Sequence, residues 1–229
     1  MADEHAGGED KMAHAALNTG TGASAQSTIA QETLAAMVAS RICHDLVSPM
    51  GAISNGLELL QLSQQAAGPE MALVMQSVAH ANTRLRLYRL AFGPVGDGHL
   101  IGQGEIRSIL EALNTHGRLR YAWNTKADLT RRQAKLLFLL LLCLETGIPW
   151  GGDLVVQDGA GGVELTASAD RVALDDAMWR ILLTSASDTA VPAARVQFAL
   201  AVTELEAQGL RVEIAALPKS LVLRVVPRS

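Results

Sequence analysis

The sequence is poor in aromatic residues, has no surplus of basic charge and contains no long hydrophobic run. Aromatic side chains make up 3% of its 229 residues, too few for the stacking platforms that bind single-stranded nucleic acid. Lysine and arginine number 19 against 23 aspartates and glutamates, a formal charge of −4, which argues against sequence-independent binding to a nucleic-acid backbone. We therefore expect no nucleic-acid partner.

The longest strongly apolar run extends from Leu136 to Leu144. It is far shorter than the roughly 20 residues that cross a bilayer, so it predicts a core helix. The polar N-terminal segment, rich in small residues, lacks the apolar centre of a secretory signal. We therefore expect a cytoplasmic protein without a membrane partner, in which Cys43 and Cys143 are reduced core residues rather than a disulfide.

With 49% hydrophobic residues, the chain can form one large domain or two small ones. Residues 1–28 are acidic and show no apolar periodicity, so we expect a disordered tail. Ser27 or Thr28 is expected to cap a helix whose apolar residues recur at steps of three and four. This stripe consists of Leu34, Val38, Ile42, Leu46, Met50, Ile53, Leu57 and Leu60.

A second stripe predicts a helix from Pro69 to the turn at Gly93 and Pro94. Its members are Met71, Val74, Val78, Ala81, Leu85, Tyr88 and Phe92. Two long helices joined by a short turn form an antiparallel hairpin, here over residues 29–93. Because a hairpin alone leaves each stripe half covered, we expect a four-helix bundle with a second copy, and hence a homodimer.

Residues 100–229 form a second domain with a mixed pattern of helices and strands. Helices are expected at 105–114, 130–146, 175–184 and 192–208, and strands at 119–124, 153–157, 163–169, 210–215 and 221–226. The two types do not alternate strictly, which favours an α+β fold over a doubly wound parallel sheet. The glycine-rich DGAGG at 158–162 is interpreted as a hairpin turn.

His44 lies in the middle of the first expected helix, about 160° from both Ile42 and Leu46, and should therefore point to solvent. Its face carries Ser40, His44, Ser48, Gly51, Asn55 and Glu58. A mid-helix glycine costs about 0.5 to 1 kcal/mol relative to alanine, and Pro49 predicts a kink at a cost of about 3 kcal/mol. Such violations of local rules gather at functional sites, although a solvated, idle histidine is the simpler interpretation.

Residues 44–49 read His-Asp-Leu-Val-Ser-Pro and resemble the H-box of two-component signalling proteins. The longer stretch SRICHDLVSPMGAISNGLELL, together with YRLAFG at the end of the second helix, resembles the ChpT-type histidine phosphotransferases over all but the tail. The resemblance implies a homodimeric four-helix bundle followed by a degenerate histidine-kinase ATPase-like α/β sandwich domain. It also implies that a phosphoryl group passes from the receiver-domain aspartate of a hybrid histidine kinase through His44 to aspartates of response regulators.

The resemblance further implies that the C-terminal domain has lost nucleotide binding, and the sequence agrees. The positions that match the magnesium-holding asparagines of a working kinase carry Leu139 and Cys143, whereas magnesium prefers oxygen ligands. No D-x-G-x-G motif follows. We expect no bound cofactor and no metal site in this chain, and Mg²⁺ only on the partner receiver domain.

His44 is the expected phosphoacceptor, and Asp45 is expected to orient or activate its ring. Antiparallel geometry brings Arg84, Arg86 and Arg89 to the level of His44, and Arg89 is favoured for pairing with the phosphoryl group because it belongs to the YRLAFG match. The partner is expected to contact Ser40, Arg41, Ser48, Pro49, Gly51, Asn55 and Arg89. For Asp45 and the other two arginines, an ordinary solvated role is the alternative.

Two other functions are compatible with this sequence. The chain could be a divergent ATP-dependent histidine kinase, or a dimeric module that docks receivers without chemistry. Incubation with ATP alone separates the first alternative from a phosphotransferase, and detection of phosphohistidine excludes the second.

Overall fold

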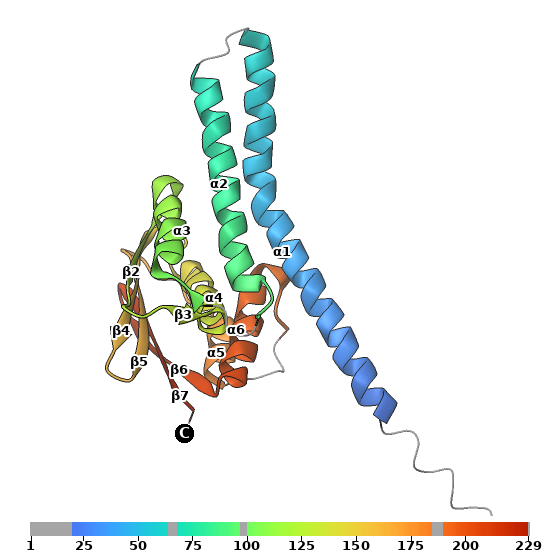
Figure 1. Ribbon diagram of the computed structural model, residues 1–229, viewed down its shortest axis with the longest axis vertical. Helices are drawn as coiled ribbons and strands as arrows, with labels where there is room; N and C mark the ends of the chain where they lie inside the picture. Colours follow the sequence, from blue (N-terminus) through green and yellow to red (C-terminus); the bar gives the residue numbers. More distant parts are fainter. Residues whose placement is uncertain (1–19, 64–67, 97–99, 185–189, 229) are drawn as a thin grey trace, which may run out of the picture.

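The computed structural model describes residues 20–63, 68–96, 100–184 and 190–228. Two long helices, α1 (Gly20–Ser63) and α2 (Pro69–Phe92), form an antiparallel hairpin that an α+β part follows. Figure 1 shows the hairpin reaching beyond the α+β part at one end, while the N-terminal half of α1 runs away from the rest of the chain at the other. The expected hairpin is confirmed.

The first helix begins at Gly20, so the expected start at Ser27 or Thr28 is wrong. The disordered state expected for residues 20–28 is wrong as well, because these residues are helical. The segment contains no proline that would stop the helix, and each residue added to an existing helix contributes a backbone hydrogen bond. Residues 1–19 of the expected tail lie outside the described residues.

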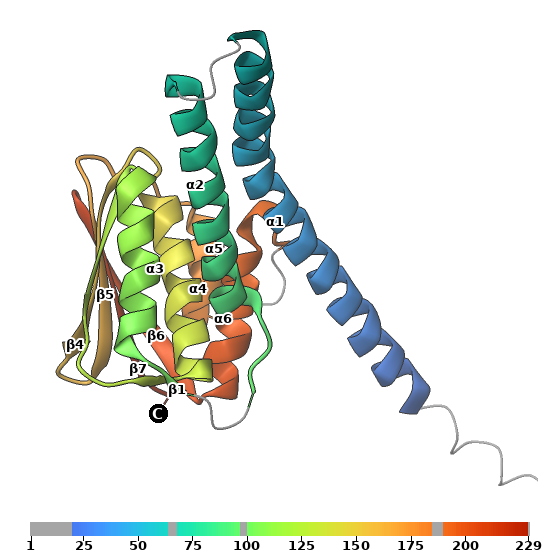
Figure 2. The same ribbon diagram turned by 45° about the horizontal axis from the view of Figure 1, so that its top comes forward.

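Pro49 lies inside α1 without ending it. Figures 1 and 2 show α1 changing direction in its middle part, which agrees with the kink expected from a missing backbone donor. Beyond this bend the two helices of the hairpin approach closely, because a Cβ added to Gly56 would lie 2.4 Å from Cγ2 of Val74. Glycine is therefore required at position 56 for this packing.

The α+β part contains short and long elements in mixed order. They are β1 (Leu100–Ile101), α3 (Gln103–His116), β2 (Leu119–Asn124), β3 (Leu129–Thr130), α4 (Arg131–Gly147), β4 (Gly152–Gly159), β5 (Gly162–Ser168), α5 (Asp176–Thr184), the 3-10 helix η1 (Ala193–Arg195), α6 (Val196–Ala207), β6 (Leu210–Leu217) and β7 (Ser220–Pro227). The helix expected at 192–208 is thus divided. Its first turn is a 3-10 turn, because Arg195 leaves the helical region at φ −121° and ψ 14°.

The main sheet has the order β2-β4-β5-β7-β6. Only β2 and β4 pair in parallel, while the other neighbours are antiparallel, so the expected α+β class is confirmed. The glycine-rich segment forms the expected turn between β4 and β5, where Gly159 pairs with Gly162. In Figure 2 the helices lie together on one side of the sheet, with the hairpin beyond them.

The second helix of this part, α4, forms the centre of the core. Thr130 caps it with a capping box, accepting a hydrogen bond from the Gln133 amide while the Gln133 side chain accepts from the Thr130 amide. Its buried face is almost continuous from Leu136 to Leu144, as the apolar run predicts. This core helix also contacts α2 of the hairpin.

Polar contacts of two arginines join α2 to α4. Arg131 donates hydrogen bonds to the carbonyls of Leu90, at 2.7 Å, and of Arg89. Farther along α2, Arg84 lies 3.5 Å from a carboxylate oxygen of Glu145. Each of the two helices therefore supplies one arginine to the connection, Arg131 from α4 and Arg84 from α2.

Large apolar side chains remain exposed on the hairpin, as expected for a hairpin without a second copy. On α1 they include Met50 and Leu57, which are 55% and 47% exposed, and on α2 they include Met75, Val78 and Leu85. Four of these side chains belong to the expected stripes. The fifth, Met75, follows Val74 of the α2 stripe by one residue.

In the described part of the chain, no helix combines the length and the apolar character that a membrane span needs.

Both cysteines are free thiols, as expected, and Cys143 is buried. Cys43 is exposed, so its expected core location is wrong. It lies about 100° around the helix from Ile42, which turns it away from the buried side of α1.

Candidate functional site

His44 projects from the middle of α1 into solvent, with 81% of its side chain exposed. The residues that share its face, Ser40, Ser48, Gly51, Asn55 and Glu58, are exposed too. A Cβ added to Gly51 would meet nothing within 4 Å, so no packing inside this chain requires glycine there. The expected outward face is confirmed, and its small side chains leave the imidazole open to a large partner.

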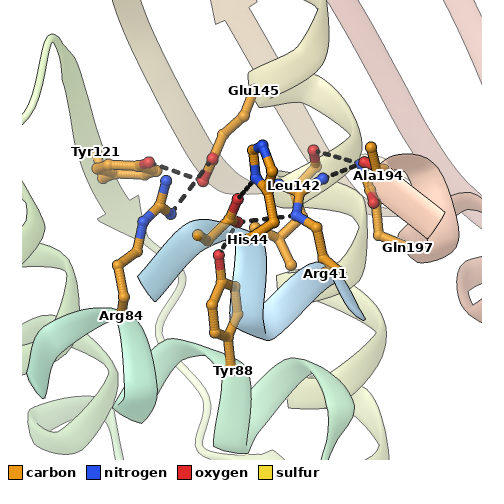
Figure 3. A network of polar contacts seen from close by, with 10 residues as sticks. Arg41, His44, Arg84, Tyr88, Tyr121, Leu142, Glu145, Ala194 and Gln197 are labelled. Carbon is orange, nitrogen blue, oxygen red and sulfur yellow. Dashed lines mark hydrogen bonds and ion pairs between the residues drawn. The ribbon is translucent and has the colours of Figure 1, made fainter. Parts of the chain in front are cut away.

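Asp45 connects this exposed imidazole to the packed side of the hairpin. Its Oδ1 lies 3.0 Å from Nδ1 of His44, and its Oδ2 lies 2.8 Å from Nε of Arg41. The hydroxyl of Tyr88, on α2, donates a hydrogen bond to the same Oδ2. Figure 3 shows Arg41, His44 and Tyr88 pointing toward one another, with dashed lines for these interactions.

The carboxylate of Asp45 is held in its ionised form. Burial is the largest influence and raises its pKa, but the hydrogen bonds from Tyr88 and His44, with the charge and hydrogen bond of Arg41, lower the pKa by more. The net pKa of Asp45 therefore lies below the ordinary value. An ionised carboxylate only accepts hydrogen bonds, so Nδ1 of His44 is the donor in this contact, and in a neutral imidazole the lone pair then belongs to Nε2.

Tyr88 is a residue of this site that the sequence interpretation missed. It was assigned only to the apolar stripe of the second helix, and it is indeed 3% exposed, with its ring stacked on Phe92 at a centroid distance of 5.3 Å. Burial raises the pKa of its hydroxyl, so the group stays protonated as a donor. The available signal was the antiparallel geometry that places residues 84–89 at the level of His44, since Tyr88 lies within this range.

Two residues of the expected partner-binding set are not freely exposed. The Arg41 side chain is only 14% exposed, because it contacts Asp45 and donates a hydrogen bond to the carbonyl of Ala194. Pro49 is buried, because it follows Ile42 by seven residues, almost two full turns, and so shares its inward face. Arg41 and Pro49 therefore lie away from the open face of His44, and their contact with the partner stays a prediction.

The three arginines of α2 have different environments. Arg84 turns inward to Glu145. Burial is the largest single influence and lowers the pKa of its guanidinium, but Glu145 and the neighbouring tyrosines and Asp45 together raise that pKa by more. Arg86 lies 3.3 Å from the hydroxyl of Ser108. Arg89, the favoured partner of a phosphoryl group, is exposed. The solvated role left open for Arg84 is excluded by its burial against Glu145.

The positions compared with magnesium-holding asparagines lie in the core. Leu139 and Cys143 are both 0% exposed within α4, and burial raises the pKa of the Cys143 thiol, which keeps it neutral. Among the residues with described positions, no three His, Cys, Asp or Glu side chains form a set that could hold a metal ion.

Comparison with known proteins gives the family. The histidine phosphotransferase C-terminal domain family matches residues 103–219, from α3 to the turn between β6 and β7. The protein phosphotransferase ChpT of Brucella abortus (strain 2308) is 37% identical over 132 residues, which cover 57% of this chain and 63% of that protein. The chain thus spans slightly less than two thirds of this curated relative.

One solved structure supports the same family. A bacterial phosphotransferase is similar with a TM-score of 0.71 and 29% identity, over 84% of this chain and 95% of that chain. The histidine kinase AdeS of Acinetobacter baumannii is more distant, with a TM-score of 0.43 and 10% identity over 80% of this chain and 95% of that one. The chain belongs to the histidine phosphotransferase family of the ChpT type.

Proposed function

We propose that this protein relays a phosphoryl group from the receiver-domain aspartate of a hybrid histidine kinase through His44 to the aspartates of downstream response regulators. The observation that carries the proposal is the 81% exposed imidazole whose Nδ1 faces the ionised Asp45. This arrangement leaves Nε2 free as a nucleophile while the other ring nitrogen is fixed. Family membership supports the same chemistry.

In the first half reaction, the Nε2 lone pair attacks the phosphorus of the partner's aspartyl phosphate. A bond between nitrogen and phosphorus forms, and the bond between phosphorus and the aspartate oxygen breaks, which releases the partner's carboxylate. The imidazole ring then carries positive charge, which the adjacent Asp45 carboxylate stabilises. In the second half reaction, the carboxylate oxygen of another receiver attacks the phosphorus, and neutral His44 is restored.

The active form in this proposal is a homodimer with a central four-helix bundle. The exposed apolar side chains of the hairpin, among them Met50, Leu57 and Leu85, supply the face that a second copy covers. His44 and Met50 lie roughly 120° apart around the helix. Dimerisation through the apolar side therefore leaves the histidine accessible.

Phosphate in this proposal comes from a receiver rather than from ATP. Leu139 and Cys143 are buried in the core of α4, and neither offers the oxygen ligand that magnesium prefers. The C-terminal part is accordingly proposed to be a degenerate ATPase-like domain without a nucleotide, and the magnesium of the reaction is that of the receiver. A cytoplasmic location follows from the same proposal, since response regulators and receivers act there.

A phosphorylated, radiolabelled receiver domain tests the proposal. The wild-type protein is expected to take up label that is lost in acid and stable in base, and His44→Ala is expected to remain folded and take up none. His80→Gln, which changes a histidine of α2, serves as the matched control and should be labelled like the wild type. Labelling of His44→Ala would show that the phosphoacceptor is a different residue.

The same protein with labelled ATP alone separates the alternative functions. No labelling is expected. Label from ATP would support a divergent histidine kinase and overturn the interpretation of Leu139 and Cys143, whereas binding to receivers without any phosphohistidine would support a docking module.

A further inference from the structure

A chain of polar contacts leads from His44 to the C-terminal part of the molecule. We propose that Tyr88 and Arg41 are positioning residues for His44 that act through Asp45, and that Arg41 ties this position to the C-terminal part at Ala194. The inference rests on the proposed function of His44 as the phosphoacceptor. In this inference, Tyr88 of α2 and Ala194 of η1 help to orient the imidazole of His44 on α1.

The two carboxylate oxygens of Asp45 have different hydrogen-bond partners. Oδ2 receives hydrogen bonds from Tyr88 and from Arg41, while Oδ1 faces Nδ1 of His44. A carboxylate with one oxygen held by two donors from two helices keeps one orientation, and its second oxygen is therefore aimed at the imidazole. Since only 16% of the Asp45 side chain is exposed, water competes weakly for these bonds.

Tyr88 is itself held firmly. Its ring stacks on Phe92 with an interplanar angle of 24°, and the guanidinium of Arg84 lies 6.0 Å from the ring centroid. The ring is 3% exposed, so the hydroxyl has little freedom to move away from Asp45. Tyr88 thus places a fixed donor at the level of His44.

Arg41 has contacts in two parts of the molecule. Its Nε donates to Asp45 and one terminal nitrogen donates to the carbonyl of Ala194 in η1. Three residues after Ala194, in α6, the Gln197 side chain lies 3.5 Å from the carbonyl of Leu142 in α4. Figure 3 shows Arg41 beside Ala194, with Gln197 and Leu142 next to them. A shift of the C-terminal part against the hairpin would therefore remove the Ala194 carbonyl that helps to hold Arg41 beside Asp45.

Tyr88→Phe tests the first half of the proposal, because it removes the hydroxyl and keeps the stacked ring. The matched control is Tyr121→Phe, which removes another buried hydroxyl that donates to a carboxylate, Glu145, at 2.8 Å. Single-turnover transfer from a phosphorylated receiver is measured at several receiver concentrations. For Tyr88→Phe the maximal rate is expected to fall about tenfold, as for loss of a hydrogen bond to a charged group, with receiver affinity unchanged, and Tyr121→Phe is expected to keep the wild-type rate.

Arg41→Lys tests the second half and remains informative if Tyr88→Phe does not fold. A lysine keeps the charge, but its single nitrogen lacks the planar fork that bridges two acceptors. The matched control is Arg131→Lys, since Arg131 also donates to carbonyls of another element. Arg41→Lys is expected to lower the maximal transfer rate roughly three- to tenfold, whereas Arg131→Lys changes stability and leaves the rate unchanged.

A double-mutant cycle with Asp45→Ala distinguishes positioning from a general structural effect. If Tyr88 and Arg41 act through Asp45, neither substitution slows transfer further in the Asp45→Ala background. Equal slowing in both backgrounds, a wild-type rate for Tyr88→Phe and Arg41→Lys, or a loss confined to receiver affinity would each overturn the inference. In all these outcomes label still depends on His44, so the failure of the inference is distinct from failure of the proposed function.

Discussion

Tyr88 and Asp45 lie 43 positions apart in the sequence and share a hydrogen bond between the two helices of the hairpin. The phenol hydroxyl of α2 thereby contacts the residue that follows the exposed His44 on α1. The bond fixes which levels of the two helices face each other, and it places a donor beside the carboxylate that holds the imidazole. The local chemistry of an exposed histidine thus depends on a buried residue of the neighbouring helix.

Acid should weaken the contribution of Asp45 to stability. The pKa of Asp45 in the folded protein is lowered from an unfolded value of about 3.9, so its stabilising contribution is complete above that value and is lost as the pH falls through the folded pKa. Asp45→Asn lacks this titration. The difference in the free energy of unfolding between wild type and variant, measured with urea, is expected to be largest at neutral pH and to shrink below about pH 4. A difference that is independent of pH would contradict the observed hydrogen bonding of Asp45.

Gly51 and Gly56 form a matched pair on the same helix. Alanine at Gly51 meets no neighbour within 4 Å, and should stabilise the protein by about 0.5 to 1 kcal/mol. Alanine at Gly56 would lie 2.4 Å from Cγ2 of Val74, and should destabilise it by about 1 to 3 kcal/mol. Urea unfolding measures both changes.

Gly51→Ala also tests whether the face of His44 is a docking surface. Because Gly51 lies on the face of His44, the added methyl group of Gly51→Ala is expected to weaken receiver binding although it stabilises the fold. Isothermal titration with the receiver measures this effect. Unchanged affinity and an unchanged transfer rate would indicate that the receiver does not approach α1 closely at position 51.

The apolar side of the hairpin is expected to hold the dimer together. Leu85→Glu places a charge on a side chain that is 45% exposed in one chain and that the second copy would bury, so it should shift the protein toward monomers. Leu217→Glu changes an apolar side chain that is 57% exposed at the end of β6 and is the matched control. Sedimentation equilibrium should find a dimer for the wild type and Leu217→Glu only. A monomeric wild type would contradict the proposed homodimeric four-helix bundle.

Much of the fold follows from local signals. The strand at 119–124 and the capping of α4 by Thr130 agree with the structure, because alternation and capping depend on neighbouring residues. The start of α1 at Gly20 did not follow, since small residues without a cap give no boundary signal. The inward position of Pro49 was available from helical spacing, but the proline was assigned to the partner surface with the rest of its motif.

The sequence predicted those features of the site that lie within the single helix α1. The outward direction of His44 and its contact with Asp45 follow from their places on α1. The contacts of Asp45 with Tyr88, and of Arg41 with Ala194, join residues that are far apart in the sequence. Such pairings depend on how the elements pack, and a periodic pattern describes each element alone.

Nuclear magnetic resonance of the phosphorylated protein, with ¹⁵N in its histidine rings, tests the central claim most directly. After transfer from a phosphorylated receiver, the ³¹P nucleus is expected to couple to Nε2 of His44, while Nδ1 carries a proton hydrogen-bonded to Asp45. Phosphate on Nδ1 of His44, or on any other residue, would contradict the account.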